Sequence, residues 1–273
     1  MTTTKRLIFN NKFISHVLIL SMIFIMAKDA KADMSDISRL KTAYPDHIQS
    51  VNEANIIWRD GTPMPVCDNN LNKSQQEKLD NPCLLDQVNN IHYKTGISKN
   101  NPESDPGRIR YQPFFQKMYG NTKSAVESKL SVIYWMPLYF GEKYPLLVTT
   151  VNDVDKKLFQ ISSELEILVG SHPEYLVYLD NPGGTFMWRT IANTDRLSAH
   201  SYGMTIDINS NFSDYWQWDL IKEGRPVAEN QQLEYRNQVP WEIIPVFEKY
   251  GFIWGGKWVH YDSMHFEYRP EIM

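Results

Sequence analysis

Histidine and aspartate side chains that suit a metal ion occur in two short stretches near the end of the 273-residue chain. The first stretch holds His200 and Asp207, and the second holds His265. Zinc takes imidazole and carboxylate ligands, and a catalytic site uses three protein ligands with a fourth position for water. These three residues could form such a set. A lone His or Asp near a turn is more often a hydrogen-bonding residue, and some of the seven histidines will lie close together by chance, so spacing leaves both interpretations open.

Two extended segments are expected to position the second and third of these residues. In residues 205–209, alternation with a period of two places Asp207 on the face opposite the isoleucines. In residues 264–268, the same alternation places His265 and Glu267 opposite the apolar side chains. If the two strands lie side by side, Asp207 and His265 face a common cleft.

The residues around the candidate ligands form two separated motifs. Residues 198–207 have the form S-x-H-x-x-G-x-x-x-D, and residues 262–267 have the form D-x-x-H-F-E. Together they resemble the M15 peptidases, the family of D-Ala-D-Ala carboxypeptidases and L-alanyl-D-glutamate endopeptidases, whose wider group includes lysostaphin-type enzymes and the hedgehog signalling domain. The likeness covers residues 184–270. It departs at Met204 and Thr205, where small residues are common, and neither position needs to touch a metal.

The resemblance implies a zinc peptidase. It assigns one zinc ion (Zn2+) per chain to His200, Asp207 and His265, and it assigns the role of general base to Asp262. Such a carboxylate takes a proton from the attacking water and passes it to the leaving amine. A solvated turn aspartate is the alternative for Asp262.

Arg189 is the candidate for stabilising an oxyanion or binding a substrate carboxylate, because a guanidinium offers a fixed fork of donors. Arg196 is its rival, and a surface salt bridge is the alternative for Arg189. Gly203 is expected to serve a tight turn. His260 and Glu267 are candidates for supporting the metal ligands from outside, and each could equally be a simple surface group.

The expected fold class is α+β, with a small antiparallel sheet that carries the zinc site and helices packed on one side, as in the hedgehog and D-Ala-D-Ala peptidase group. Apolar residues at steps of three and four predict a helix over residues 154–168, ended by Gly170. A second helix is predicted over residues 241–250. Strands are predicted over residues 131–137, 144–150 and 175–179.

The chain divides into three predicted regions. Residues 1–32 have the layout of a secretory signal peptide, because Lys5 and Arg6 precede an apolar run that ends near Ala32. The run is too short and too interrupted for a membrane span, so an uncleaved anchor is the weaker alternative and no stable membrane insertion is expected after cleavage. Residues 33–108 form an N-terminal arm, and residues 109–273 form the peptidase domain.

Cys67 and Cys83 are the two cysteines of the chain. In an oxidising compartment they are expected to form a disulfide within the N-terminal arm. Two thiolates without further ligands nearby make a poor zinc set, so free or metal-bound thiols are the alternative.

The whole chain narrows the function class. Its formal net charge of −4 gives no electrostatic case for nucleic acid, which needs a clustered basic surface.

The expected partner is the stem peptide of peptidoglycan, and the expected location is the periplasm, the cell envelope or the medium. Within the resemblance to the M15 peptidases, Asp262 in place of a glutamate three residues before His265 implies an L-alanyl-D-glutamate endopeptidase. The alternative activity is that of a D-alanyl-D-alanine carboxypeptidase. Two further alternatives for the protein's role are a non-catalytic zinc-binding module and an exported lysis protein or toxin.

Overall fold

The computed structural model describes residues 36–67, 70, 72–89, 92–98, 101–192 and 194–273. The signal peptide predicted over residues 1–32 lies outside these residues. Within them the chain is an α+β protein with small antiparallel sheets, which confirms the predicted fold class. Among the helices of the described residues, none has the length and apolar character that a membrane crossing requires.

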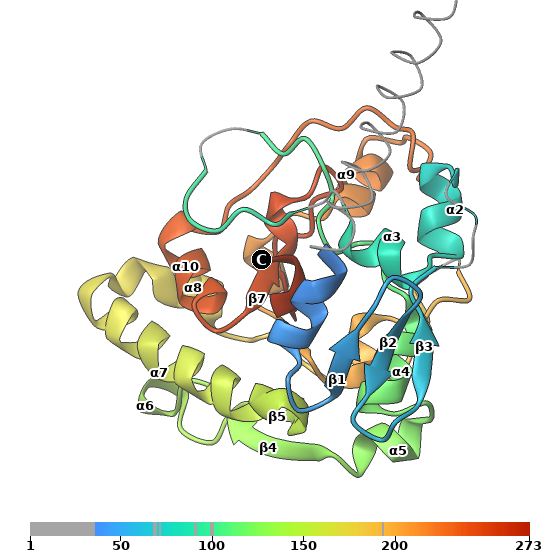
Figure 1. Ribbon diagram of the computed structural model, residues 1–273. Coiled ribbons are helices and arrows are strands. Elements are labelled where there is room, and N and C mark those ends of the chain that lie inside the picture. Colours follow the sequence, from blue (N-terminus) through green and yellow to red (C-terminus); the bar gives the residue numbers. More distant parts are fainter. Residues whose placement is uncertain (1–35, 68–69, 71, 90–91, 99–100, 193) are drawn as a thin grey trace, which may run out of the picture.

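Three small antiparallel sheets occur in the described residues (Figure 1). The first contains β1 (Ile48–Val51), β2 (Asn55–Trp58) and β3 (Pro63–Pro65) in that order. The second pairs β4 (Leu130–Tyr134) with β5 (Pro145–Thr149), which confirms the two strands predicted there. The third has the order β6-β8-β7, with β6 (Thr205–Asp207), β8 (His265–Tyr268) and β7 (Phe252–Trp254).

Helices surround these sheets, and most of them are short. Residues 36–43 are helical. The α-helices that follow are α2 (Gln75–Asp80), α3 (Leu84–Val88), α4 (Gln112–Tyr119), α5 (Lys123–Glu127), α6 (Pro137–Phe140), α7 (Val154–Ser171), α8 (Leu176–Leu179), α9 (Trp216–Lys222) and α10 (Ile244–Glu248). The helix predicted over residues 241–250 is confirmed as a 3-10 turn, η5 (Trp241–Ile243), that runs into α10.

α7 carries the apolar spacing that predicted it. Val154, Leu158, Ile161 and Leu165 are fully buried, and the helix packs against β4 and β5. The predicted end at Gly170 is wrong, because the helix continues to Ser171 and His172 donates its N–H to the last carbonyls. A glycine inside a helix costs only about 1 kcal/mol relative to alanine, which the buried face of α7 outweighs.

The strand predicted over residues 175–179 is also wrong. This segment is helical, with a 3-10 turn, η2 (Pro173–Tyr175), followed by α8. Pro173 starts the turn, because its fixed φ is that of a helix and its missing N–H is not needed there. A short apolar run gives no periodicity with which to distinguish strand from helix.

One hydrophobic core joins the N-terminal segment to the remainder of the chain. Tyr44 packs edge-on against Phe114 at 5.6 Å between ring centroids. Phe115 then contacts Tyr202 at 5.8 Å. In Figure 1 the N-terminal helix, in blue, lies in front of β7 at the centre of the molecule. The boundary predicted between residues 108 and 109 stays a prediction, and both of its sides contribute to this core.

The predicted disulfide is wrong for this structure. The sulfur atoms of Cys67 and Cys83 lie 2.7 Å apart, which is longer than the roughly 2.05 Å of an S–S bond, and the two residues are not joined. Cys83 instead stands at the start of α3, where its N–H donates to Asp86 at 2.8 Å. Packing and hydrogen bonds therefore hold this segment.

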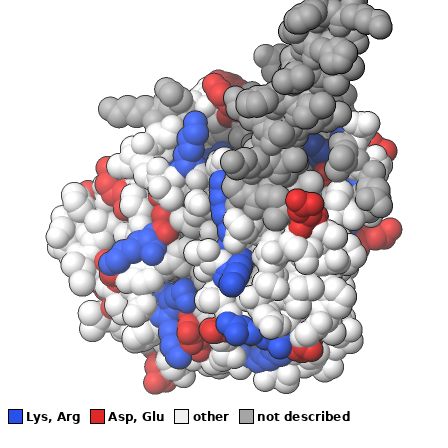
Figure 2. Space-filling view, viewed as in Figure 1, with Lys and Arg blue, Asp and Glu red and all other residues white. Residues whose placement is uncertain are grey.

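Charges of both signs are mixed on the face shown in Figure 2. Blue and red side chains are both scattered over the described residues there, with uncharged side chains between them. This agrees with 28 basic and 32 acidic residues in the whole sequence. Long-range steering of a charged partner depends on a larger field of one sign than this face presents.

Candidate metal centre

β6 and β8 bring two of the predicted ligands opposite each other. The strands are antiparallel, and Asp207 is the register partner of His265, which confirms that the two segments lie side by side. The neighbouring pair, Ile206 and Phe266, is fully buried in the core. Because successive side chains point to opposite faces, burial of this pair directs Asp207 and His265 into the cleft.

His200 reaches the same point from a 3-10 turn, η3 (Ala199–Tyr202). The hydroxyl of Ser198 caps this turn, and Gly203 ends it with a φ of 65°. A Cβ atom at Gly203 would lie 2.7 Å from Leu130 Cδ2, so the position suits glycine for its conformation and for its space. The tight turn predicted at Gly203 is confirmed.

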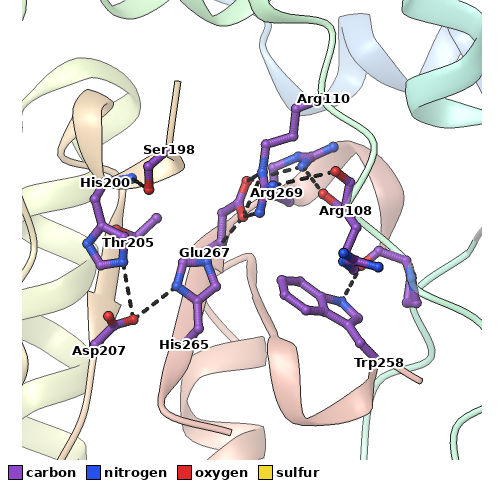
Figure 3. A network of polar contacts seen from close by, with 12 residues as sticks. Arg108, Arg110, Ser198, His200, Thr205, Asp207, Trp258, His265, Glu267 and Arg269 are labelled. Atoms are coloured by element: carbon purple, nitrogen blue, oxygen red, sulfur yellow. Dashed lines mark hydrogen bonds and ion pairs between the residues drawn. The ribbon is translucent and has the colours of Figure 1, made fainter. Parts of the chain in front are cut away.

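The donor atoms of the three residues converge on one point (Figure 3). Asp207 Oδ1 lies 3.2 Å from His200 Nε2 and 3.0 Å from His265 Nδ1. One ligand atom from each residue lies within 4.8 Å of the others. Ligands of a tetrahedral zinc ion with bonds of about 2.0–2.1 Å stand about 3.3 Å apart, so the donor set and its spacing fit zinc.

The outward nitrogens of both imidazoles are also held. His200 Nδ1 donates to the carbonyl oxygen of Thr185 at 2.8 Å, and His265 Nε2 donates to Glu267 at 3.3 Å. A carbonyl or carboxylate in this position fixes the tautomer and leaves a lone pair on the nitrogen that faces the metal. His200 would therefore bind through Nε2 and His265 through Nδ1.

Electrostatics at the three residues favour a bound cation. Burial alone would raise the pKa of Asp207, yet His200 and His265 hold it below its ordinary range. Burial alone would lower the pKa of His265, yet hydrogen bonds to Asp207 and Glu267 raise it to about 10. A metal ion bound at this point would replace the proton on His265 Nδ1. Metal binding would therefore release a proton to solvent.

Asp262 lies on the loop before β8 and faces the same cleft. Its N–H donates to Gly255 O at 3.0 Å, and its carbonyl accepts the N–H of His265 at 3.1 Å. Its Oδ1 atom is buried and finds no hydrogen-bond partner among the described residues. Burial, with the charge of Asp207, raises the pKa of Asp262 to about 6 against the attraction of the two histidines. A carboxylate with an unengaged oxygen and a pKa near neutrality suits proton transfer.

These groups line a cleft of about 500 Å³. Arg189 and Arg196 also line it, from a hairpin in which Thr190 is bridged to Leu197. Arg189 is exposed and forms no ion pair with the described residues, whereas Arg196 donates to Leu79 O at 3.0 Å and lies 3.7 Å from Asp80. Arg189 is therefore the more available cation.

Of the two residues predicted to support the metal ligands from outside, one contacts a ligand and the other does not. Glu267 contacts His265, as the shared strand face suggested. His260 lines the cleft but does not contact the three ligands. Its Nδ1 and Nε2 atoms bond instead to Asp105 at 2.6 Å and to Glu229 O at 3.0 Å.

Two arginines next to Glu267 went undetected in the sequence. Arg110 and Arg269 both donate to this carboxylate, and Figure 3 shows it between them and His265. Glu267 was predicted to be either a supporting residue or a surface group, and its need for a counter-charge follows from its burial in the structure. Arg110 is 157 residues away, and no local pattern singles it out.

A comparison with protein-family models matches residues 192–268 to the family described as D-alanyl-D-alanine carboxypeptidase, of the M15 peptidases. Neither the curated proteins nor the solved structures give a match. The matched segment contains His200, Asp207, Asp262 and His265, and it begins after Arg189. The match therefore supports an M15 family peptidase, as the two motifs had indicated.

Proposed function

We propose that this chain is a zinc-dependent peptidase that hydrolyses an amide in the stem peptide of peptidoglycan. The observation that carries the proposal is the convergence of one oxygen and two nitrogen donors beside an unengaged carboxylate in an open cleft. His200, Asp207 and His265 would hold the ion, with Asp262 as the general base. The family match supports a peptidase acting on the cell wall.

The chain's own residues divide the chemical work. A zinc ion held at the three donors would polarise the scissile carbonyl and acidify the attacking water. Asp262, ionised above pH 6, accepts a proton from that water and delivers it to the leaving amine. The buried sheet behind the ligands fixes their directions, so that little reorganisation accompanies the reaction.

Arg189 would bind a carboxylate of the substrate or the oxyanion that develops on the carbonyl. Alternation along the hairpin places Arg189, Ile191, Arg196 and Ser198 on one face, and all four line the cleft. The side chain of Arg189 donates only to Thr190 O among the described residues, at 3.4 Å, so most of its donors are available. Arg196 is tied to α2 and would shape the wall of the cleft.

The bond cut is proposed to be that between L-alanine and D-glutamate. Asp262, in place of a glutamate three residues before His265, supports this choice through the resemblance already described. The second candidate is a D-alanyl-D-alanine carboxypeptidase, because the matched family model has that description. Both reactions use the same metal and base and differ in how the cleft seats the peptide.

We also propose that the protein works outside the cytoplasm, in the periplasm, the envelope or the medium. The support is the basic start and apolar run of residues 1–32. Peptidoglycan lies in the same compartment.

The test is digestion of purified peptidoglycan by the protein with residues 1–32 removed, with zinc supplied, followed by mass spectrometry of the fragments. New amino-terminal D-glutamate identifies the endopeptidase, and released D-alanine identifies the carboxypeptidase. Asp262→Ala is the control and should release neither. Zinc binding without any fragment would indicate a non-catalytic module and overturn the peptidase proposal.

A further inference from the structure

His265 depends on a buried carboxylate for its orientation. Nδ1 faces Asp207, and Nε2 donates to Glu267 Oε2 at 3.3 Å. If Glu267 turned away, the ring could rotate or take the other tautomer, and the lone pair on Nδ1 would be lost. The position of the Glu267 carboxylate therefore controls the metal ligand.

Glu267 is itself completely buried, so its charge must be balanced. Arg110 donates from Nε to both carboxylate oxygens, at 2.8 and 3.1 Å, and its Nη2 contacts Oε2 as well. Arg269 donates from Nη1 at 3.1 Å. A guanidinium that holds both oxygens fixes the plane of the carboxylate, which a single contact cannot do.

The two arginines differ in their other contacts and in their exposure. Arg269 is fully buried and also holds Glu271 at 2.6 Å and Gly107 O at 2.8 Å. Glu271 in turn accepts from the hydroxyl of Tyr44 at 2.7 Å, so this side of the network belongs to the core. The side chain of Arg110 is 16% exposed at the cleft, and Glu267 is its one ion-pair partner among the described residues.

The backbone just before Arg110 follows a path that places its side chain next to Glu267. Gly107 has a φ of 95°, and a Cβ atom there would lie 2.4 Å from Ile253 Cδ1 on β7. Glycine suits this position because L side chains rarely adopt such a φ, and because its missing side chain leaves room for Ile253. The carbonyl of Gly107 is held by Arg269, so residues 107–110 lie against the sheet that carries His265.

We propose that Arg110 is a positioning residue of the metal centre. It holds Glu267 so that the carboxylate accepts the Nε2 proton of His265 and Nδ1 stays open to zinc. Arg110 lies outside the matched residues 192–268, so the family segment alone does not contain the whole centre. The inference rests on the proposed zinc site and not on which bond is cut.

The test is zinc affinity, measured by competition between a chromophoric chelator and the purified metal-free protein. Arg110→Gln should bind Zn2+ about 10- to 100-fold more weakly, the usual cost of losing a partner outside the ligands. Arg110→Lys keeps the charge but loses the fork and should fall between. Arg108→Gln is the matched control, because Arg108 lines the same cleft and pairs with Glu229 and Asp105 instead. It should bind zinc as the wild type does.

A double-mutant cycle with Glu267→Gln adds a second readout. If Arg110 acts through Glu267, the double variant should bind zinc no more weakly than Glu267→Gln alone. A purely structural Arg110 would lower the melting temperature of the metal-free variant and leave its zinc affinity unchanged, and this result would overturn the inference. If the wild type itself binds no zinc, the proposed metal site fails first.

Discussion

Replacing Asp262 by asparagine should separate catalysis from folding and metal binding. The substitution keeps the shape of the side chain, and the backbone bonds of residue 262 to Gly255 and His265 do not depend on its charge. A general base contributes about 10²- to 10⁴-fold in rate, so Asp262→Asn should lose at least a hundredfold in kcat/KM at pH 7. Zinc content should stay at one ion per chain, because the three ligands are untouched.

The same variant should be more stable than the wild type when metal-free. Folding raises the pKa of Asp262 from 3.8 to about 6, so the ionised carboxylate destabilises the folded state above pH 6. At about 1.4 kcal/mol per unit of pKa the penalty is at most about 3 kcal/mol, and partial exposure reduces it. It fades as the pH falls through 6 and is absent below about 3.8.

Two assays check this reasoning. Thermal melting of the chelator-treated proteins at pH 7.5 and pH 4 should show a stabilised variant only at the higher pH. Release of new amino groups from peptidoglycan should give the loss of rate. In the wild type, kcat/KM should fall as the pH drops below about 6. A bound dication would lower the pKa of Asp262 and move this acidic limb of the pH profile to lower pH. A variant that keeps a tenth of the activity, or a limb above pH 7, would refute the assignment of the base.

The remaining predictions concern the ligands, the cleft and the turn. Chelation should abolish hydrolysis and added zinc should restore it, and His265→Ala should lose stoichiometric zinc in metal analysis; undiminished zinc would contradict the ligand set. Arg189→Gln should lower kcat/KM about 10- to 100-fold through a lost charged hydrogen bond, whereas Arg196→Gln should cost under about threefold, and equal losses would argue against the distinction. Gly203→Ala should destabilise the fold by about 1–3 kcal/mol in denaturant unfolding, more than Gly224→Ala, because only the former meets a neighbour.

Local sequence patterns were sufficient for the strands of the metal centre. Alternation along residues 205–209 and 264–268 required Asp207 and His265 to leave the core, and antiparallel pairing then placed them opposite each other. His200 was a candidate from its residue type and spacing, but only the two-motif resemblance favoured it as a ligand, because a 3-10 turn has no periodic signal of its own. The grouping of the three residues therefore followed from short-range pattern and family likeness together.

Long-range and weakly patterned features escaped prediction. The pair of Arg110 with Glu267 joins residues 157 positions apart, and no spacing rule reaches that far. The segment of residues 175–179 is too short to show the periodicity of a strand or of a helix. Pro173 favours the helical start that the structure has. Cys67 and Cys83 do lie in contact, but proximity in the fold did not amount to a covalent bond.

The central place of β8 in its sheet has a consequence for the order of folding. This strand needs β6, 58 residues earlier at the Asp207–His265 pair, and Arg110, 157 residues earlier, while the neighbouring Glu271 needs Tyr44, 227 residues earlier. Contacts of such separation form late, because the entropy of closing long loops must be overcome first. Before residues 44–271 have packed, the chain holds both histidine stretches but does not fix their geometry. Tight binding at the proposed zinc site would therefore coincide with completion of the fold.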